Sequence, residues 1–274
     1  MKNRKVGFIG AGNMAQTMIK ALIDSGTLTA DQIYVTNRSS NKSQKLQETY
    51  GIQPLTTNEA LIEKCDTVVI AVKPQDLTDA LEPIATSFHD GHLVMSLAAG
   101  YTLASLKKLL PEVKSLARVM PNTPSSIQRG VIGYCMAPNS EALFGVVEDF
   151  LKPMGFVVKL PEGEQFEALT VSAASGTGFI LELMEYWQEW IMEHGIEPIT
   201  ARKMVVETFM GAAMIAEKQQ IPFNELQERV VSKKGVTAAG LQSMRELEVE
   251  RALRYSFEKA ALRDQEIART SAKS

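Results

Sequence analysis

Short apolar runs alternate with amphipathic segments along roughly the first 160 residues of the chain. The runs are typical of strands buried on both faces, and they span residues 6–9, 32–36, 67–72, 93–97, 115–120, 130–135 and 156–160. Helical spacing between them predicts helices over residues 14–24, 41–50, 75–87, 102–109 and 140–152. This alternation predicts an α/β fold with a Rossmann-type, doubly wound parallel sheet.

The strand pattern stops after the Pro161-Glu162-Gly163 step, and only helical spacing follows. Helices are predicted over residues 164–193 and 200–218, from Pro222 onward, and, with breaks, over residues 237–269. Their Met and Ala side chains have no sheet to cover, so we expect helices of a second subunit to complete the core. The sequence thus predicts a Rossmann domain over residues 1–161 and an all-α dimerisation domain over residues 162–274.

Composition and charge argue against several classes of protein, namely nucleic-acid-binding, membrane, secreted and metal-binding proteins. The net charge of −3 gives no electrostatic reason to expect nucleic acid or an anionic membrane as a partner. No apolar run is long enough to span a membrane, and the first residues lack a signal-peptide core. Cys65 and Cys135 lie far apart in sequence, which favours a reducing compartment, the cytoplasm. The three histidines have no ligand spacing, so we expect no metal site and no histidine-based triad.

The first predicted strand runs directly into a glycine-rich turn. Gly10, Gly12 and Ala15 form a G-x-G-x-x-A pattern between that strand and the first helix. Gly10 permits the tight turn, and Gly12 lets the backbone approach a pyrophosphate at the helix N-terminus. We therefore predict a dinucleotide site that includes Gly10, Ala11, Gly12, Asn13 and Met14.

The end of the second predicted strand indicates which dinucleotide binds. Enzymes that use NAD usually have Asp or Glu there to hold the ribose diol. This chain has Asn37 and Arg38 instead, and a guanidinium can hold a 2′-phosphate through two charged hydrogen bonds. The pattern favours NADP(H), with NAD(H) as the weaker alternative. The alternative interpretation of Arg38 is a surface side chain in a solvated turn.

The chain also resembles the Δ1-pyrroline-5-carboxylate reductases over nearly its whole length. The motifs that carry the resemblance are GFIGAGNMA at residues 7–15, AVKP at 71–74, SLAAG at 96–100, MPNTP at 120–124, SGTG at 175–178 and SKKGVT at 232–237. The resemblance implies reduction of the cyclic imine 1-pyrroline-5-carboxylate to L-proline by NADPH, the last step of proline synthesis. It also implies that the helical domain interleaves with a partner into homodimers, which can assemble further.

Several further cofactor contacts follow from the resemblance. The family pattern assigns cofactor binding to Ala71, Val72, Lys73, Pro74, Ala98, Ala99, Asn122 and, on the adenosine side, Asn58. Most of them follow predicted parallel strands at their carboxyl ends, where open α/β sheets bind ligands. Without the resemblance, Lys73 is an exposed loop cation and Asn58 is the N-cap of a helix that begins at Glu59.

The loop before residue 237 is the expected substrate site. The resemblance assigns substrate binding to Gly235, Val236 and Thr237, with the Thr237 hydroxyl as the catalytic group that hydrogen-bonds the ring nitrogen. Free N–H groups at the start of the following helix suit a substrate carboxylate. On helix propensity alone, Thr237 is instead a helix cap.

Two motifs depart from the family pattern. The loop is typically S-P-G-G-T-T, and here Lys233, Lys234 and Val236 replace its Pro, first Gly and first Thr. The helical motif is typically S-G-S-G-P-A-Y, and here Phe179 and Leu181 replace its Pro and Tyr. These departures keep two alternatives open: a related reductase of another cyclic imino acid or a 3-hydroxy acid, and a dinucleotide-binding regulatory protein with little turnover. The 3-hydroxy-acid enzymes use a helix lysine that this chain lacks after Gly176.

Overall fold

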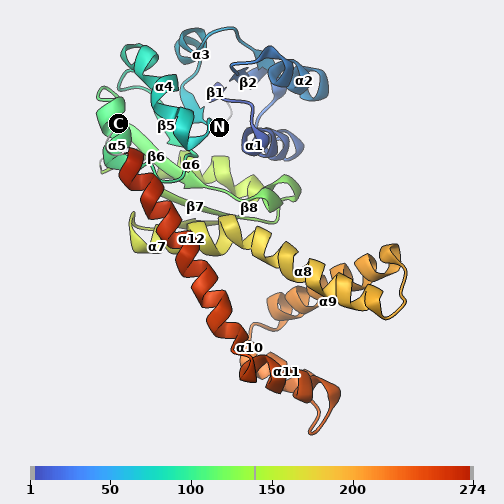
Figure 1. Cartoon of the computed structure of the whole chain (residues 1–274). Helices are drawn as coiled ribbons and strands as arrows, with labels where there is room; N and C mark the ends of the chain where they lie inside the picture. Colours follow the sequence, from blue (N-terminus) through green and yellow to red (C-terminus); the bar gives the residue numbers. More distant parts are fainter. Residues whose placement is uncertain (1–3, 139, 272–274) are drawn as a thin grey trace. The chain divides into compact units, whose positions relative to one another are not determined.

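The computed structural model describes residues 4–138 and 140–271, which form two compact units (Figure 1). The first unit contains the chain up to Thr177 together with the segment that begins at Ala260. The second unit spans Gly178–Lys259. The predicted boundary between residues 161 and 162 coincides with neither end of the second unit, and it remains a prediction.

A mixed sheet forms the centre of the first unit, with the strand order β3-β2-β1-β4-β5-β6-β7-β8. The strands are β1 (Val6–Ile9), β2 (Ile33–Thr36), β3 (Gln53–Pro54), β4 (Thr67–Ile70), β5 (Leu93–Ser96), β6 (Ser115–Met120), β7 (Gly130–Met136) and β8 (Gly155–Lys159). Strands β1 to β6 are parallel, which confirms the Rossmann-type sheet. The chain changes direction between β1 and β4, the switch point at which such sheets bind ligands.

Three strands differ from the expectation. β7 pairs antiparallel with β6, with Met120 opposite Gly133, and β8 then pairs parallel with β7. The segment between β6 and β7 is too short for the helical crossover that a parallel connection requires. The short strand β3 was not predicted, because it contains no apolar run.

Helices cover both faces of this sheet. They are α1 (Asn13–Asp24), α2 (Ser40–Tyr50), α3 (Asn58–Lys64), α4 (Leu77–Leu81), α5 (Leu103–Leu109) and α6 (Phe144–Leu151). The expected helices over residues 75–87 and 140–152 are wrong in length, since α4 and α6 each continue as 3-10 turns. Pro83 and Pro153 lie in those turns, and proline has no N–H to continue an α-helix.

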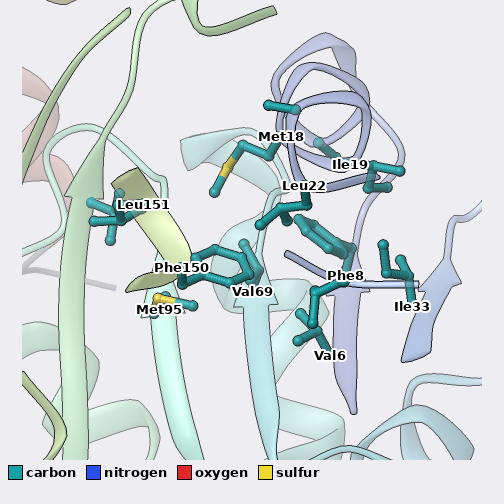
Figure 2. Close-up of a cluster of buried hydrophobic side chains, with 14 of the residues drawn as sticks. Val6, Phe8, Met18, Ile19, Leu22, Ile33, Val69, Met95, Phe150 and Leu151 are labelled. Carbon is teal, nitrogen blue, oxygen red and sulfur yellow. The ribbon is translucent and has the colours of Figure 1, made fainter. Parts of the chain in front are cut away.

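The core holds the carboxyl ends of the strands in place. On one face, Phe8 of β1 and Met95 of β5 pack with side chains of α1 and α6 such as Leu22 and Phe150 (Figure 2). On the other face, side chains of β4 such as Ile70 pack with α3, α4 and α5. Because the strands are buried on both faces, the loops at their ends start from rigid positions.

The predicted helix over residues 164–193 consists of α7 (Glu164–Leu169), a π-helical turn at Thr170–Ser175 and α8 (Gly176–Glu193). Phe166 and Leu169 pack against Met120 and Cys135 of the sheet. Because of this packing, α7 belongs to the first unit. The sequence could not show this, because the apolar spacing continues through the turn.

The end of the chain also packs on the first unit. The backbone of Gly100 has a φ of +76°, and a Cβ there would lie 2.5 Å from the side chain of Ile267 and 2.8 Å from the backbone nitrogen of Ala268. Gln265 donates a hydrogen bond of 3.0 Å to Glu167. These contacts explain why residues from Ala260 belong to the first unit.

The second unit is helical. It contains most of α8, then α9 (Pro198–Gln219), α10 (Phe223–Val230), α11 (Val236–Glu246) and the first part of α12 (Val249–Ser271). The predicted helix over residues 237–269 is therefore divided, and Glu248 at the division has a φ of +51°. No helix in the described part of the chain is long and apolar enough to cross a membrane.

Candidate functional site

The glycine turn connects the three central strands. Gly10 has a φ of +106°, and a Cβ there would lie 2.8 Å from the backbone oxygen of Ala71, so this position requires glycine. The N–H of Gly10 donates a hydrogen bond of 2.9 Å to Thr36, and the N–H of Ala71 donates one of 2.8 Å to Ile9. The turn is therefore anchored to the ends of both β2 and β4.

Asn37 holds the second residue of the turn. Its side-chain oxygen accepts a hydrogen bond of 3.0 Å from the N–H of Ala11, and its amide donates to the backbone oxygen of Ser39 at 2.8 Å. Helix α1 then begins after Gly12, with no side chain capping its first turn and no acid in it. The N–H groups at this helix start are thus available to an anion.

A cleft of about 850 Å³ opens at the carboxyl ends of β1, β2 and β4. It brings together eight of the predicted cofactor residues: Gly10, Gly12, Asn37, Arg38, Asn58, Ala71, Val72 and Lys73. Residues from four separate segments of the chain thus meet in one hollow. Its position at the switch point of the sheet is the position expected for a dinucleotide.

Asn58 is bound to the end of β2. Thr36 donates a hydrogen bond of 2.6 Å to the side-chain oxygen of Asn58. The expectation that Asn58 caps its helix is wrong, because the Thr57 hydroxyl accepts the hydrogen bond from the N–H of Ala60 and is the cap. The side chain of Asn58 is therefore turned to Thr36 and to the cleft.

Charged side chains of both signs line the cleft. Arg38 and Lys42 come from the end of β2 and the start of α2, and both are exposed. Asp76 and Asp79 come from the segment after β4. Lys42 was missed by the sequence analysis, although its place four residues after Arg38 puts it in the first turn of the helix that follows β2.

The remaining predicted cofactor residues do not line this cleft: Ala11, Asn13, Met14, Pro74, Ala98, Ala99 and Asn122. The buried side chain of Asn122 donates to the backbone of Ala173 at 3.1 Å and accepts from the N–H of Val131 at 2.9 Å. These two bonds tie β7 to the π-helical turn. The side chain of Asn122 is thus engaged within the fold, and its role in binding a cofactor remains a prediction.

The predicted substrate residues lie in the second unit. Gly235 is the N-cap of α11, which begins at Val236 and has no acid in its first turn. Thr237 is exposed and is the second helical residue, so the expectation that it caps the helix is wrong. Val236 is 93% exposed, so the described residues leave this position at the start of the helix uncovered.

Neither cysteine is a candidate nucleophile. Burial raises the pKa of the Cys65 thiol to about 12 and that of Cys135 to about 11, so both stay protonated near neutral pH. Within residues 4–138 and 140–271, no group of three His, Cys, Asp or Glu side chains could hold a metal ion. The cleft at the switch point of the sheet suits a dinucleotide, and a bound nicotinamide dinucleotide would supply hydride chemistry.

Two family profiles match the chain. Residues 5–100 match a family described as NADP oxidoreductase coenzyme F420-dependent, and residues 163–267 match one described as pyrroline-5-carboxylate reductase dimerisation. A pyrroline-5-carboxylate reductase of Haemophilus influenzae is 33% identical over 243 residues, which cover 88% of this chain and 89% of that protein. The chain belongs to the pyrroline-5-carboxylate reductase family.

Solved structures agree with membership of the pyrroline-5-carboxylate reductase family. A pyrroline-5-carboxylate reductase from Coxiella burnetii is 28% identical with a TM-score of 0.87, covering 97% of this chain and 98% of that one. A Plasmodium falciparum pyrroline carboxylate reductase with NADP bound has a TM-score of 0.89 at 22% identity, covering 98% and 99% of the two chains. The second similarity supports the fold alone.

The departures from the pyrroline-5-carboxylate reductase pattern have visible consequences in the structure. Lys234 stands where the pattern has glycine, and it adopts a left-handed φ of +60°. Phe179 stands where the pattern has proline, and its ring packs against that of Phe257 with 5.4 Å between centroids. Lys234 thus keeps the left-handed backbone that glycine adopts easily, and this conformation is strained for a residue with a side chain.

Proposed function

We propose that this protein reduces 1-pyrroline-5-carboxylate to L-proline with NADPH, the last step of proline biosynthesis. The observation that carries the proposal is the cleft at the switch point of the sheet, in a chain of this family, with Arg38 and no carboxylate at the end of β2. A carboxylate at that position would repel a 2′-phosphate. The proposed enzyme is an oxidoreductase that acts on a C=N bond, with NADPH preferred and NADH as the weaker alternative.

The chain's residues fit NADP. The uncapped start of α1 can receive the pyrophosphate, with Gly12 leaving room for its approach. Arg38 and Lys42 would hold the 2′-phosphate, and Asn58 would face the adenosine ribose. Lys73, Pro74, Ala98, Ala99 and Asn122 remain the proposed residues of the nicotinamide side. When bound, NADPH supplies the hydride that the reduction needs.

The start of α11 is the proposed substrate site. The free N–H groups of Val236 and Thr237 suit the carboxylate of an imino acid. The Thr237 hydroxyl would hydrogen-bond the ring nitrogen and orient the C=N carbon. A protonated imine is already electrophilic, so no strong general acid is required.

We also propose a cytoplasmic homodimer that can assemble further. The helices of the second unit expose large apolar side chains, among them Trp187, Trp190, Met210 and Met214. A second copy of this chain would cover them, because exposed apolar area of this kind marks an interface. The two buried, unpaired cysteines support a reducing compartment.

The deciding experiment follows NADPH oxidation with 1-pyrroline-5-carboxylate and a panel of other cyclic imino acids. The strained Lys234 and the exposed Val236 favour one alternative, a related imino-acid reductase, which would turn over another ring faster. Turnover of pyrroline-5-carboxylate at the highest kcat/KM supports the proposal. Tight NADPH binding without turnover of any ring would contradict it and favour a regulatory protein.

A further inference from the structure

The cleft contains opposite charges that do not pair with one another. Arg38 and Lys42 line it, and so do Asp76 and Asp79. Across residues 4–138 and 140–271, none of these four side chains forms a salt bridge. The two signs are therefore more than ion-pair distance apart within a single hollow.

The sheet order explains this separation. β2 and β4 lie on opposite sides of β1. Arg38 and Lys42 follow β2, and both carboxylates follow β4, with the glycine turn of β1 between them. Lys73 also follows β4, so the cleft has a cationic wall at β2 and a wall at β4, here called the acidic wall, that carries both carboxylates and one lysine.

The acidic wall needs an explanation, because the proposed ligand is a polyanion. Asp76 is the residue before α4, yet its side chain makes no capping hydrogen bond, and Asp79 is exposed. A carboxylate only accepts hydrogen bonds, so a ligand group that faces it must donate. Carboxylates near a helix start also stabilise the helix dipole, which is the alternative explanation for both residues.

The adenine base of NADP offers a suitable donor at this end of the cleft. If Arg38 and Lys42 hold the 2′-phosphate, the base is attached to the neighbouring ribose carbon and must lie close by. Adenine carries a 6-amino group that donates, whereas hypoxanthine and guanine carry an oxygen that accepts at the same position. A carboxylate that faces position 6 would accept a hydrogen bond from the amino group and would be repelled by the oxygen.

We propose that Asp79 selects adenine at the base end of the cofactor cleft and that Asp76 makes a smaller contribution. This inference rests on the proposed function. The two residues are specificity determinants for the 6-amino group. Arg38 and Lys42 select the 2′-phosphate, so one wall of the cleft recognises the phosphate and the other recognises the 6-amino group of the same nucleotide. Deamino-NADP⁺, in which hypoxanthine replaces adenine, exchanges the 6-amino donor for an oxygen acceptor.

The test is calorimetric binding of NADP⁺ and deamino-NADP⁺ to the full chain, with no substrate present. We expect the unaltered protein to prefer NADP⁺ by about tenfold, the worth of one charged hydrogen bond. Asp79→Asn should reduce this preference to less than about threefold, because an amide can also donate to a 6-oxo group. Asp76→Asn should have a smaller effect in the same direction.

Asp31→Asn is the matched control, since Asp31 is an exposed aspartate outside the cleft, and it should keep the full preference. Equal binding of the two nucleotides by the unaltered protein would overturn the inference and leave the proposed function intact. So would an unchanged preference in Asp79→Asn with a lowered melting temperature, which would assign the carboxylate to the helix dipole. Absence of NADP⁺ binding would overturn the proposed function as well.

Discussion

The side chain of Asn37 accepts a hydrogen bond of 3.0 Å from the backbone N–H of Ala11. One amide thereby connects the glycine turn after β1 to the end of β2. Its own N–H group is directed to the backbone oxygen of Ser39 at 2.8 Å, so the loop that carries Arg38 is held by the same residue. Asn37 thus couples the expected pyrophosphate end of the cleft to the expected 2′-phosphate end.

Asn37→Asp should change the cofactor preference rather than the fold. The carboxylate keeps an acceptor for Ala11, but it places a negative charge beside the expected 2′-phosphate and loses the donor to Ser39. We expect kcat/KM for NADPH to fall by at least about tenfold while that for NADH changes little. An equal fall for both cofactors would show that the change damages the turn instead.

Arg38 and Lys42 should contribute unequally to the NADPH preference. Arg38→Ala should lose about 2 kcal/mol of it, a factor of about thirty, since it removes a two-pronged charged contact, and Lys42→Ala about 1 kcal/mol. Both losses should shrink as salt rises. Lys45→Ala, an exposed position of α2 outside the cleft, is the control. Equal kcat/KM for NADH and NADPH in the unaltered protein would rule out this assignment.

Thr237→Ala should lower kcat/KM for the imino acid by about tenfold to a hundredfold, because a positioned neutral hydroxyl is worth about 1–3 kcal/mol. Thr237→Ser should keep most of the activity. The melting temperature should not change, since Gly235 and not Thr237 is the N-cap of α11. Normal turnover with earlier melting would instead assign Thr237 a structural role.

Lys234→Gly should stabilise the protein by up to about 1 kcal/mol, because it relieves a left-handed backbone that costs a side chain about 1–2 kcal/mol. The greater freedom of glycine in the unfolded chain offsets part of this gain. Lys233→Ala is the matched control. If KM rises and loses its salt dependence in either variant, that lysine binds the substrate.

Asp264 should make stability depend on pH. It is buried, and desolvation raises its pKa, with Arg118 opposing the shift and Glu167 adding to it. An acid with a raised pKa in the folded state binds protons more readily there, so its contribution is favourable at low pH and is lost as pH rises through that pKa. Asp264→Asn should therefore stabilise the protein at pH 8, with a gain that disappears toward pH 4.

Urea unfolding of the Asp264→Asn variant at several pH values measures this dependence. Glu258→Gln, an exposed acid on the same helix, should show no such trend. A variant that is destabilised at pH 8 would show that Asp264 is bound favourably by Arg118, and the sign of the prediction would be wrong. Arg118 also forms an ion pair of 2.8 Å with Glu162, and the substitution removes neither of these two residues.

The parts of the fold that were predicted well from the sequence depend on short segments, namely apolar runs and glycine positions. The apolar residues Val6, Phe8 and Ile9 predicted β1, because few residue types fit a strand that is buried on both faces. Gly10 predicted the turn after it, because its φ of +106° favours glycine. Arg38 was predicted as a cofactor residue from its position after the second strand alone, and it lines the cleft. The short strand β3 had no such signal, and the direction of β7 depended on the length of a connection.

The remaining features of the site depend on contacts between residues that are far apart in the sequence. The order of residues along the chain determined which segments are strands and helices, where the glycine turn lies, and that Arg38 rather than a carboxylate ends β2. Only the folded sheet brought Lys42, Asp76 and Asp79 to one cleft, joined Asn58 to Thr36, and returned Ile267 to Gly100. Hydrophobic periodicity indicates which face of each helix or strand is buried. Contacts between residues from separate elements depend instead on how those elements pack in three dimensions.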